Sequence, residues 1–175
     1  MQGLINAYEA IRDFLELGGP VLRAIAWVIL IMWVLILERL IFFRTALRKL
    51  VKDAFTSWEA RSERRSWHAH QIRSAMISEI RMAANSGLPL IQTLVALCPL
   101  LGLLGTVTGM IAVFQAMASA GTGNVRAMAA GVSMATVPTM AGMVGALSGV
   151  FLVTILTRTV RRRISLLEDD LTMDH

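Results

Sequence analysis

The chain has 175 residues, of which 55% are hydrophobic and only 17% charged, with a mean hydropathy of +0.62. This composition excludes an ordinary soluble domain and favours long apolar runs over one buried core. The net charge of +5 is compatible with nucleic-acid binding, but the basic residues gather beside apolar runs, as in the flanks of a membrane protein.

The first segment, residues 1–20, predicts a short amphipathic helix. Glu9, Asp13 and Glu16 fall away from its apolar face, which consists of Leu4, Ile5, Tyr8, Ile11 and Leu15. The "GGP" at 18–20 then interrupts the helix, because glycine is a poor helix former and proline starts a new helix well. We expect this helix to lie on the non-cytoplasmic membrane surface. Its early acidic residues do not fit a signal peptide.

Residues 21–43 predict a first transmembrane helix. The only charge in 21–37 is Arg23, and this run makes about 25 Å of helix, slightly less than the hydrocarbon core of a bilayer. The aliphatic stem of Arg23 lets its charge reach the interface, and the following "ERLIFF" lengthens the span. Glu38 and Arg39 are therefore expected near the inner membrane surface.

Residues 44–87 differ in character and predict a cytoplasmic helical segment. Nine Lys or Arg residues stand against four acidic ones. Two apolar patterns indicate two helices, each with one face for a partner helix: Leu47, Val51, Ala54 and Trp58 in the first, and Ile72, Met76, Ile80 and Ala83 in the second. The basic residues fit a solvated flank on the inner side of a membrane. A nucleic-acid-binding patch is the less favoured alternative.

Two long uncharged runs, 88–118 and 127–157, predict the second and third transmembrane helices. The glycine and proline of "NSGLP" at 85–89 separate the first run from the preceding helix. Residues 119–126 form the turn between the runs, and 158–175 form a C-terminal tail. Most basic residues lie in the middle segment and the tail. The positive-inside rule therefore places both in the cytoplasm, with the N-terminus and the turn outside.

The second and third spans share a glycine pattern. "GLLGTVTG" and "GMVGALSG" repeat glycine at the same offsets and give each helix a stripe of small residues: Gly102, Gly105 and Gly109 in one, and Gly142, Gly145 and Gly149 in the other. Such stripes let membrane helices approach closely. They either pack the hairpin of the two spans together or let copies of the chain pack into a ring.

Thr106 and Thr139 lie deep in these spans. A single threonine in a membrane helix commonly bonds its hydroxyl back to the preceding turn and has no further role. Pro138 points to a second interpretation, because it leaves the carbonyl of Met134 without its helical N–H partner. A freed group at membrane depth is tolerated only against protein or water. We therefore expect the third span to turn this face toward a protein-lined or water-lined interior.

The spans lack ionisable groups that could carry chemistry. No Asp or Glu occurs between Glu79 and Glu168, Arg126 lies in the outer turn, and the histidines lie outside the spans, at positions 68, 70 and 175. Intramembrane hydrolysis needs a nucleophile with a base, and a metal needs clustered ligands. We therefore expect no catalytic residue, no metal, no cofactor and no enzyme activity. A lone Cys98 excludes an internal disulfide. If the protein moves ions, a partner must supply the acid.

Three stretches carry a family resemblance: "ERLIFFR" at the end of the first span, "LCPLLGLLGTVTGM" in the second and "GVSMATVPTMAGMVGAL" in the third. Together they resemble the ExbB/TolQ/MotA proton-channel family, most closely its ExbB branch, over about residues 36 to 160. The resemblance implies an all-α integral membrane protein with three transmembrane helices and cytoplasmic helical extensions. It also implies a homo-oligomeric ring, typically of five copies, in the inner membrane of a Gram-negative bacterium.

The resemblance further implies a function. In the family the ring surrounds two helices of a single-span partner, ExbD in this branch, whose aspartate passes protons along the ring's threonines. Here those threonines fall on Thr106 and Thr139, the latter beside Pro138. Proton flow becomes mechanical work on a TonB-like protein that opens outer-membrane transporters. A TolQ-like motor for outer-membrane integrity is the alternative within the family. Membrane lipids are further expected partners, and nucleic acid is not.

The chain departs from the family pattern at two positions. Many members carry a glutamate where this chain has Met134, so the role of that glutamate is absent or belongs to the partner. Pro138 is also not the usual residue at its position. The short middle segment argues against the flagellar MotA branch and suits a compact ExbB variant that works with an additional periplasmic accessory protein.

Two other classes of function fit less well. Matching glycine patterns on antiparallel spans suggest the inverted repeats of a substrate carrier, but three spans give no equal halves and no polar cluster marks a substrate site. A non-conducting scaffold that ties a cytoplasmic helical bundle to the membrane suits the basic segment. It leaves Pro138 and the two deep threonines unexplained.

Overall fold

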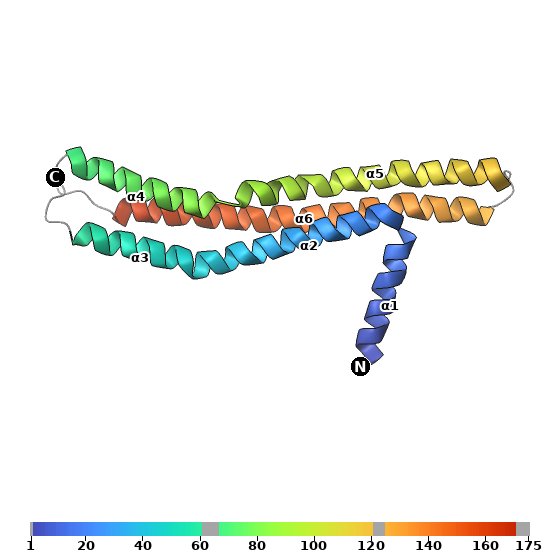
Figure 1. The fold of residues 1–175 in the computed structure, drawn as a ribbon, viewed down its shortest axis with the longest axis horizontal. Helices are drawn as coiled ribbons and strands as arrows, with labels where there is room; N and C mark the ends of the chain where they lie inside the picture. The colour runs from blue at the N-terminus through green and yellow to red at the C-terminus, as the bar shows by residue number, and fades with distance from the viewer. Residues whose placement is uncertain (1, 61–66, 121–124, 171–175) are drawn as a thin grey trace. The chain divides into compact units, whose positions relative to one another are not determined.

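The computed structural model describes residues 2–60, 67–120 and 125–170, and every regular element in these ranges is an α-helix (Figure 1). This confirms the all-α prediction. The helices are α1 (Gln2–Leu17), α2 (Gly19–Arg44), α3 (Ala46–Glu59), α4 (Trp67–Asn85), α5 (Leu88–Ala120) and α6 (Val125–Asp170). The chain divides into two compact units: unit 1 with Met1–Trp33 and Thr93–Val150, and unit 2 with Val34–Gln92 and Phe151–His175.

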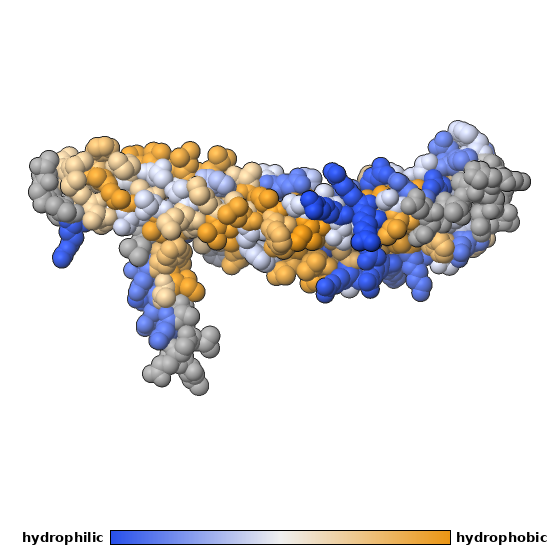
Figure 2. Space-filling view, turned by 180° about the vertical axis from the view of Figure 1, so that it is seen from behind, coloured by the Kyte–Doolittle hydropathy of each residue, from blue (hydrophilic) through white to orange (hydrophobic). Residues whose placement is uncertain are grey.

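Three stretches are long and apolar enough to cross a membrane, as the sequence predicted: Gly19–Glu59, Trp67–Ser119 and Met128–Glu168. Many of their large apolar side chains are exposed; Trp27 is 65% exposed and Leu147 is 71% exposed. Figure 2 shows hydrophobic side chains over much of unit 1, whereas many of the most hydrophilic ones lie over unit 2 and over α1, the first helix of unit 1. Lipid tails or another protein can cover such an apolar surface favourably, and water cannot.

In unit 1, α5 and α6 pack along seams whose buried residues alternate at intervals of three and four. The buried positions include Val95, Cys98, Gly102, Gly105, Gly109 and Val113 in α5, and Gly131, Ala135, Pro138, Gly142, Gly145 and Gly149 in α6. This spacing is that of helices packed at a shallow angle, as in coiled coils. The two glycine stripes are therefore part of a longer buried seam, which larger residues such as Val95 and Val113 continue.

In unit 2, α3 and α4 pack against each other. Of the side chains predicted to face a partner helix, Leu47, Trp58 and Ile80 are buried, and the others are half-buried: Val51, Ala54, Ile72, Met76 and Ala83. The buried face of α4 consists of Ala69, Ile77, Ile80 and Ala84. The predicted face of α4 is therefore rotated by about one position. The prediction took one set of apolar residues with helical spacing, and the buried set is the neighbouring one, which includes Ala69, Ile77 and Ala84.

The region expected as a C-terminal tail is helical as far as Asp170. A further apolar stripe continues along it and is buried: Leu156, Val160, Ile164 and Leu167. The guanidinium of Arg73 donates a hydrogen bond to the backbone carbonyl of Glu168 at 2.5 Å, and Arg81 forms an ion pair with the Glu168 carboxylate. These contacts attach the end of α6 to α4 within unit 2.

The junction between α4 and α5 turns at Gly87, whose φ of +78° is strained for any residue with a side chain. The guanidinium of Arg39 occupies the space beside it, since a Cβ at position 87 would lie 2.6 Å from Arg39 Nε. The same guanidinium lies 5.3 Å from the centre of the Phe42 ring. Only 14% of the Arg39 side chain is exposed. Arg39 is thus a packing residue of unit 2.

Candidate functional site

The α5 glycines lie in close contact with α6. A Cβ at Gly102 would lie 3.0 Å from the Cα of Thr139, and one at Gly109 would lie 2.5 Å from backbone atoms of Ala135. At Gly105 a Cβ would lie 2.5 Å from the Cβ of Pro138. Two helices in such contact leave no room for a methyl group, and their backbones supply much of the contact surface.

The α6 glycines face two different helices. A Cβ at Gly142 would lie 2.5 Å from the carbonyl oxygen of Cys98 in α5. One at Gly145 would lie 2.5 Å from Ile29 Cδ1 of α2, and Gly149 lies against both Met32 and Val95. All six glycines of the stripes therefore pack against helices of their own chain. Of the two interpretations of the stripes, this geometry matches internal packing, and it adds α2 as a third helix of the seam.

Thr139 is the hydroxyl that connects the two helices. Its Oγ1 lies 3.1 Å from the carbonyl oxygen of Gly102 in α5 and 3.4 Å from that of Ala135 in its own helix. A hydroxyl has one proton to donate, so these two carbonyls share it or compete for it. Pro138, next to Thr139, is fully buried. Since proline has no N–H, the carbonyl of Met134 loses its regular helical donor one turn earlier.

Thr106 lies on α5 close to the level of Thr139. It follows Gly102 by four residues, which is about 6 Å along the helix, and Gly102 accepts the Thr139 hydrogen bond. The Thr106 hydroxyl donates to the carbonyl of Leu103 at 2.7 Å. Both threonines are half-buried. The structure thus brings the two predicted threonines to neighbouring heights on one hairpin of unit 1.

Three further hydroxyls of the hairpin donate to carbonyls of their own helices. Thr108 donates to Gly105, Thr136 to Val132 and Ser148 to Gly145, at 3.0, 3.1 and 2.8 Å. A hydroxyl bonded in this way has a committed proton but keeps lone pairs that accept hydrogen bonds. The hairpin therefore offers acceptors to a neutral acid or to water.

The hairpin contains no group that titrates near neutral pH as an acid or base within residues 99–120 and 128–150. These ranges hold no Asp, Glu, Lys, Arg or His. Among the residues that the structure describes, no three His, Cys, Asp or Glu side chains gather as metal ligands. A threonine can accept and orient a proton donor but cannot store the proton itself. Proton transfer along this hairpin would therefore require a titrating group from outside it.

Three features of these sites are absent from the sequence-based prediction. Cys98 extends the glycine seam of α5 by one turn. Its position four residues before Gly102 could have predicted this, because residues four apart share a helix face. The contact of Ile29 with Gly145 had no local signal, because it depends on which face of α2 meets α6. The same holds for the Arg39 guanidinium against Gly87.

The sequence of the chain was compared with models of known protein families. Residues 41–169 match a family model described as the MotA/TolQ/ExbB proton channel family. The match covers well over half of the chain and includes Thr106 and Thr139. No curated protein matches the chain significantly.

Proposed function

The chain belongs to the MotA/TolQ/ExbB proton channel family, and on this premise we propose that it is the three-span subunit of an ExbB-type motor. Several copies, typically five in such motors, form a ring around the membrane helices of an ExbD-like partner. The partner supplies the titrating aspartate. Proton flow through the ring is converted into mechanical work on a TonB-like protein and energises import across the outer membrane.

The observation that carries this proposal is the pairing of Thr139 with Gly102 in a hairpin without acids or bases. Because the Thr139 proton is committed to a carbonyl, its oxygen accepts a hydrogen bond from a protonated carboxyl group and not from a carboxylate. The same holds for Thr106. These threonines therefore stabilise the neutral, proton-carrying form of the partner's aspartate inside the membrane, where an unpaired carboxylate is costly.

The distribution of charge supports the proposed orientation. The basic residues of α3, α4 and the end of α6 belong to the cytoplasmic side, and α1 to the periplasmic side of a Gram-negative inner membrane. Met134 stands where many family members have glutamate. In this chain the partner's aspartate is then the single carboxylate that titrates in the pathway.

The first experiment is native mass spectrometry of the detergent-solubilised protein, alone and co-expressed with a neighbouring single-span protein that has a membrane Asp. We expect a ring of five copies that takes up a small number of partner chains. A monomer or dimer that ignores the partner would instead favour the membrane scaffold. Specific rescue of outer-membrane integrity, without an effect on import, would favour a TolQ-like motor.

The second experiment replaces Thr139 with valine in the assembled complex. The change keeps the side-chain shape and removes the hydroxyl, so we expect proton uptake in proteoliposomes and energised import to fall about tenfold, the equivalent of about 1.4 kcal/mol for the lost hydrogen bond to the neutral aspartic acid. Thr108→Val is the matched control, since Thr108 lies two residues from Thr106, away from its face of α5. Equal transport in Thr139→Val and Thr108→Val would contradict the role of Thr139.

A further inference from the structure

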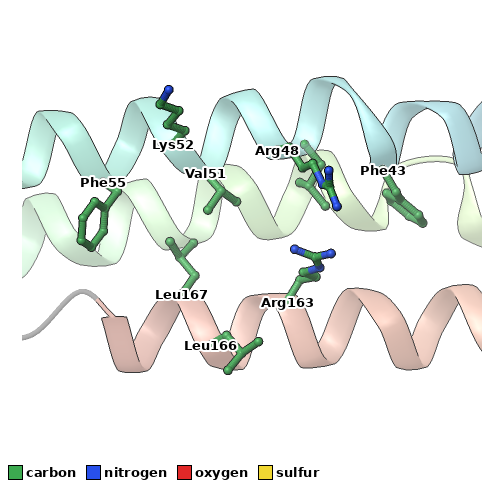
Figure 3. Close-up of a pocket in the computed structure, with 9 residues that line it drawn as sticks. Phe43, Arg48, Val51, Lys52, Phe55, Arg163, Leu166 and Leu167 are labelled. Atoms are coloured by element: carbon green, nitrogen blue, oxygen red, sulfur yellow. The ribbon is translucent and has the colours of Figure 1, made fainter.

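A groove lies in unit 2 between α3 and the last turns of α6 (Figure 3). It has a volume of about 450 Å³ and is lined by Phe43, Leu47, Arg48, Val51, Lys52, Phe55, Arg163, Leu166 and Leu167. A second hollow of about 250 Å³ adjoins it and shares Phe43, Leu47, Arg48 and Arg163. The two form one continuous groove, and the larger hollow alone is in the size range of small-molecule sites.

The groove combines apolar walls with unpaired positive charge. Arg44, Arg48, Lys52 and Arg163 line its two parts, and no acidic residue does. Within the part of the chain that the structure describes, none of these four cations forms an ion pair; the pairs there involve Arg12, Arg39 and Arg81. The groove is therefore complementary to an anion.

Two of the cations face each other. Figure 3 shows the guanidinium groups of Arg48, on α3, and Arg163, on α6, both directed into the space between the helices, whereas Lys52 points away from α6. Two like charges held across a narrow gap repel each other, and an anion between them reverses the sign of that interaction. Guanidinium groups also match the geometry of phosphate oxygens.

The apolar wall continues directly from this charged position. Val51 and Leu167 point toward one another across the groove, and Phe43 and Phe55 border it (Figure 3). An inorganic anion would leave this wall uncovered. An occupant with a phosphate and a hydrocarbon chain satisfies both parts of the groove.

The position along the chain fits the same occupant. Arg44 directly follows the apolar run of α2, and Arg48 follows four residues later, about 6 Å further along a helix. The headgroup layer on each side of a bilayer is about 5–8 Å deep. Measured from the predicted end of the first span at residue 43, Arg48 falls within the headgroup layer, which contains the lipid phosphates.

We propose that this groove is a specific binding site for an anionic phospholipid. The lipid phosphate lies between Arg48 and Arg163, and an acyl chain lies along Leu47, Val51 and Leu167. By bridging α3 and α6 the lipid removes the repulsion between the two arginines and holds the two helices together. This site is independent of the threonines in unit 1 and of the proton pathway.

The test counts lipids bound to the delipidated full-length protein by native mass spectrometry during titration with phosphatidylglycerol or phosphatidylcholine. We expect wild-type protein to bind phosphatidylglycerol more tightly. The variant Arg48→Gln/Arg163→Gln should lose at least about tenfold in affinity for it, since bonds between charged partners are at stake. Arg48→Lys/Arg163→Lys should recover most of that binding, which separates loss of charge from misfolding.

The matched control is Lys49→Gln/Arg162→Gln. Both residues are exposed, lie beside the groove cations in sequence and do not line the groove, and the change in net charge is the same. This control should bind phosphatidylglycerol like the wild type. If the two double variants lost the same affinity for phosphatidylglycerol, the effect would come from general surface charge, and the proposal would be overturned. Equal affinity for the two lipids, or a second protein chain cross-linked to Val51→Cys in place of lipid, would also overturn it.

Discussion

The helices of unit 1 pack against one another through a different kind of contact from the helices of unit 2. In unit 1 the helices meet at glycines, where an added Cβ at Gly109 or Gly142 would lie 2.5 Å from backbone atoms. In unit 2 the helices meet through large apolar side chains such as Trp58 and Leu167, and through the ion pair of Arg81 with Glu168. The helices of unit 1 are therefore held by close packing of their backbones, and those of unit 2 by the burial of apolar side chains and by an ion pair.

The amino-acid composition of each unit explains the difference, because unit 1 is almost uncharged in α5 and α6 whereas α3 and α4 of unit 2 carry many charges. Lipid tails are as apolar as the helices, so helices in a membrane gain stability only from close packing and hydrogen bonds. Water drives apolar side chains together and solvates the charges around them. An added methyl group should therefore cost most where a glycine of unit 1 faces the backbone of its neighbour.

The largest effect is expected for Gly142→Ala. Its new Cβ would meet the carbonyl oxygen of Cys98, a backbone atom that cannot move without shifting α5. We expect destabilisation by about 1–3 kcal/mol, after allowance for the better helix propensity of alanine. The measurement is the thermal unfolding midpoint in detergent, followed by tryptophan fluorescence.

Gly145→Ala is the matched control for this prediction. Its Cβ would meet Cδ1 and Cγ1 of Ile29, and side-chain atoms shift more readily than the backbone of a helix. We expect a change of less than about 1 kcal/mol, of either sign. Equal losses of stability at positions 142 and 145 would show that contact with backbone is not what makes unit 1 sensitive.

A smaller effect is expected for Gly87→Ala in unit 2. An alanine with a φ near +78° costs about 1–2 kcal/mol, and its Cβ would displace the Arg39 guanidinium. Gly87→Asn should cost less, because asparagine tolerates this conformation better. The unfolding midpoints of Gly87→Ala, Arg39→Ala and the double variant form a mutant cycle. Strict additivity in that cycle would contradict the contact between the two residues.

The smallest effect is expected for Glu168→Gln. The Arg81 and Glu168 side chains are 55% and 39% exposed, so their ion pair contributes less than about 1 kcal/mol, and high salt should remove the difference from wild type. Hydrogen exchange of the last turns of α6 at low and high salt measures this. Glu79→Gln, which changes one exposed charge on α4, is the control. A salt-independent increase in exchange would show that the carboxylate acts by packing.

Much of the fold was predictable because its signals are local. The apolar runs predict three spans by length and composition, and glycine offsets identify the seam by helical periodicity. The hydroxyls of Thr106 and Thr139 stood out against uncharged surroundings. The face of α4 was predicted about one position away from the buried one, because two neighbouring sets of apolar residues have helical spacing there and the sequence does not say which set is buried.

The candidate site was predictable only as a set of residues. The sequence by itself determined that the membrane segments contain deep threonines, a proline and no acid, since these are facts of composition within each span. Only the tertiary structure decided that Thr139 donates to Gly102 and that Gly145 packs on α2. The physical reason is that apolar surroundings do not distinguish one apolar helix face from another. The pairing of faces is set instead by the fit of all three helices together.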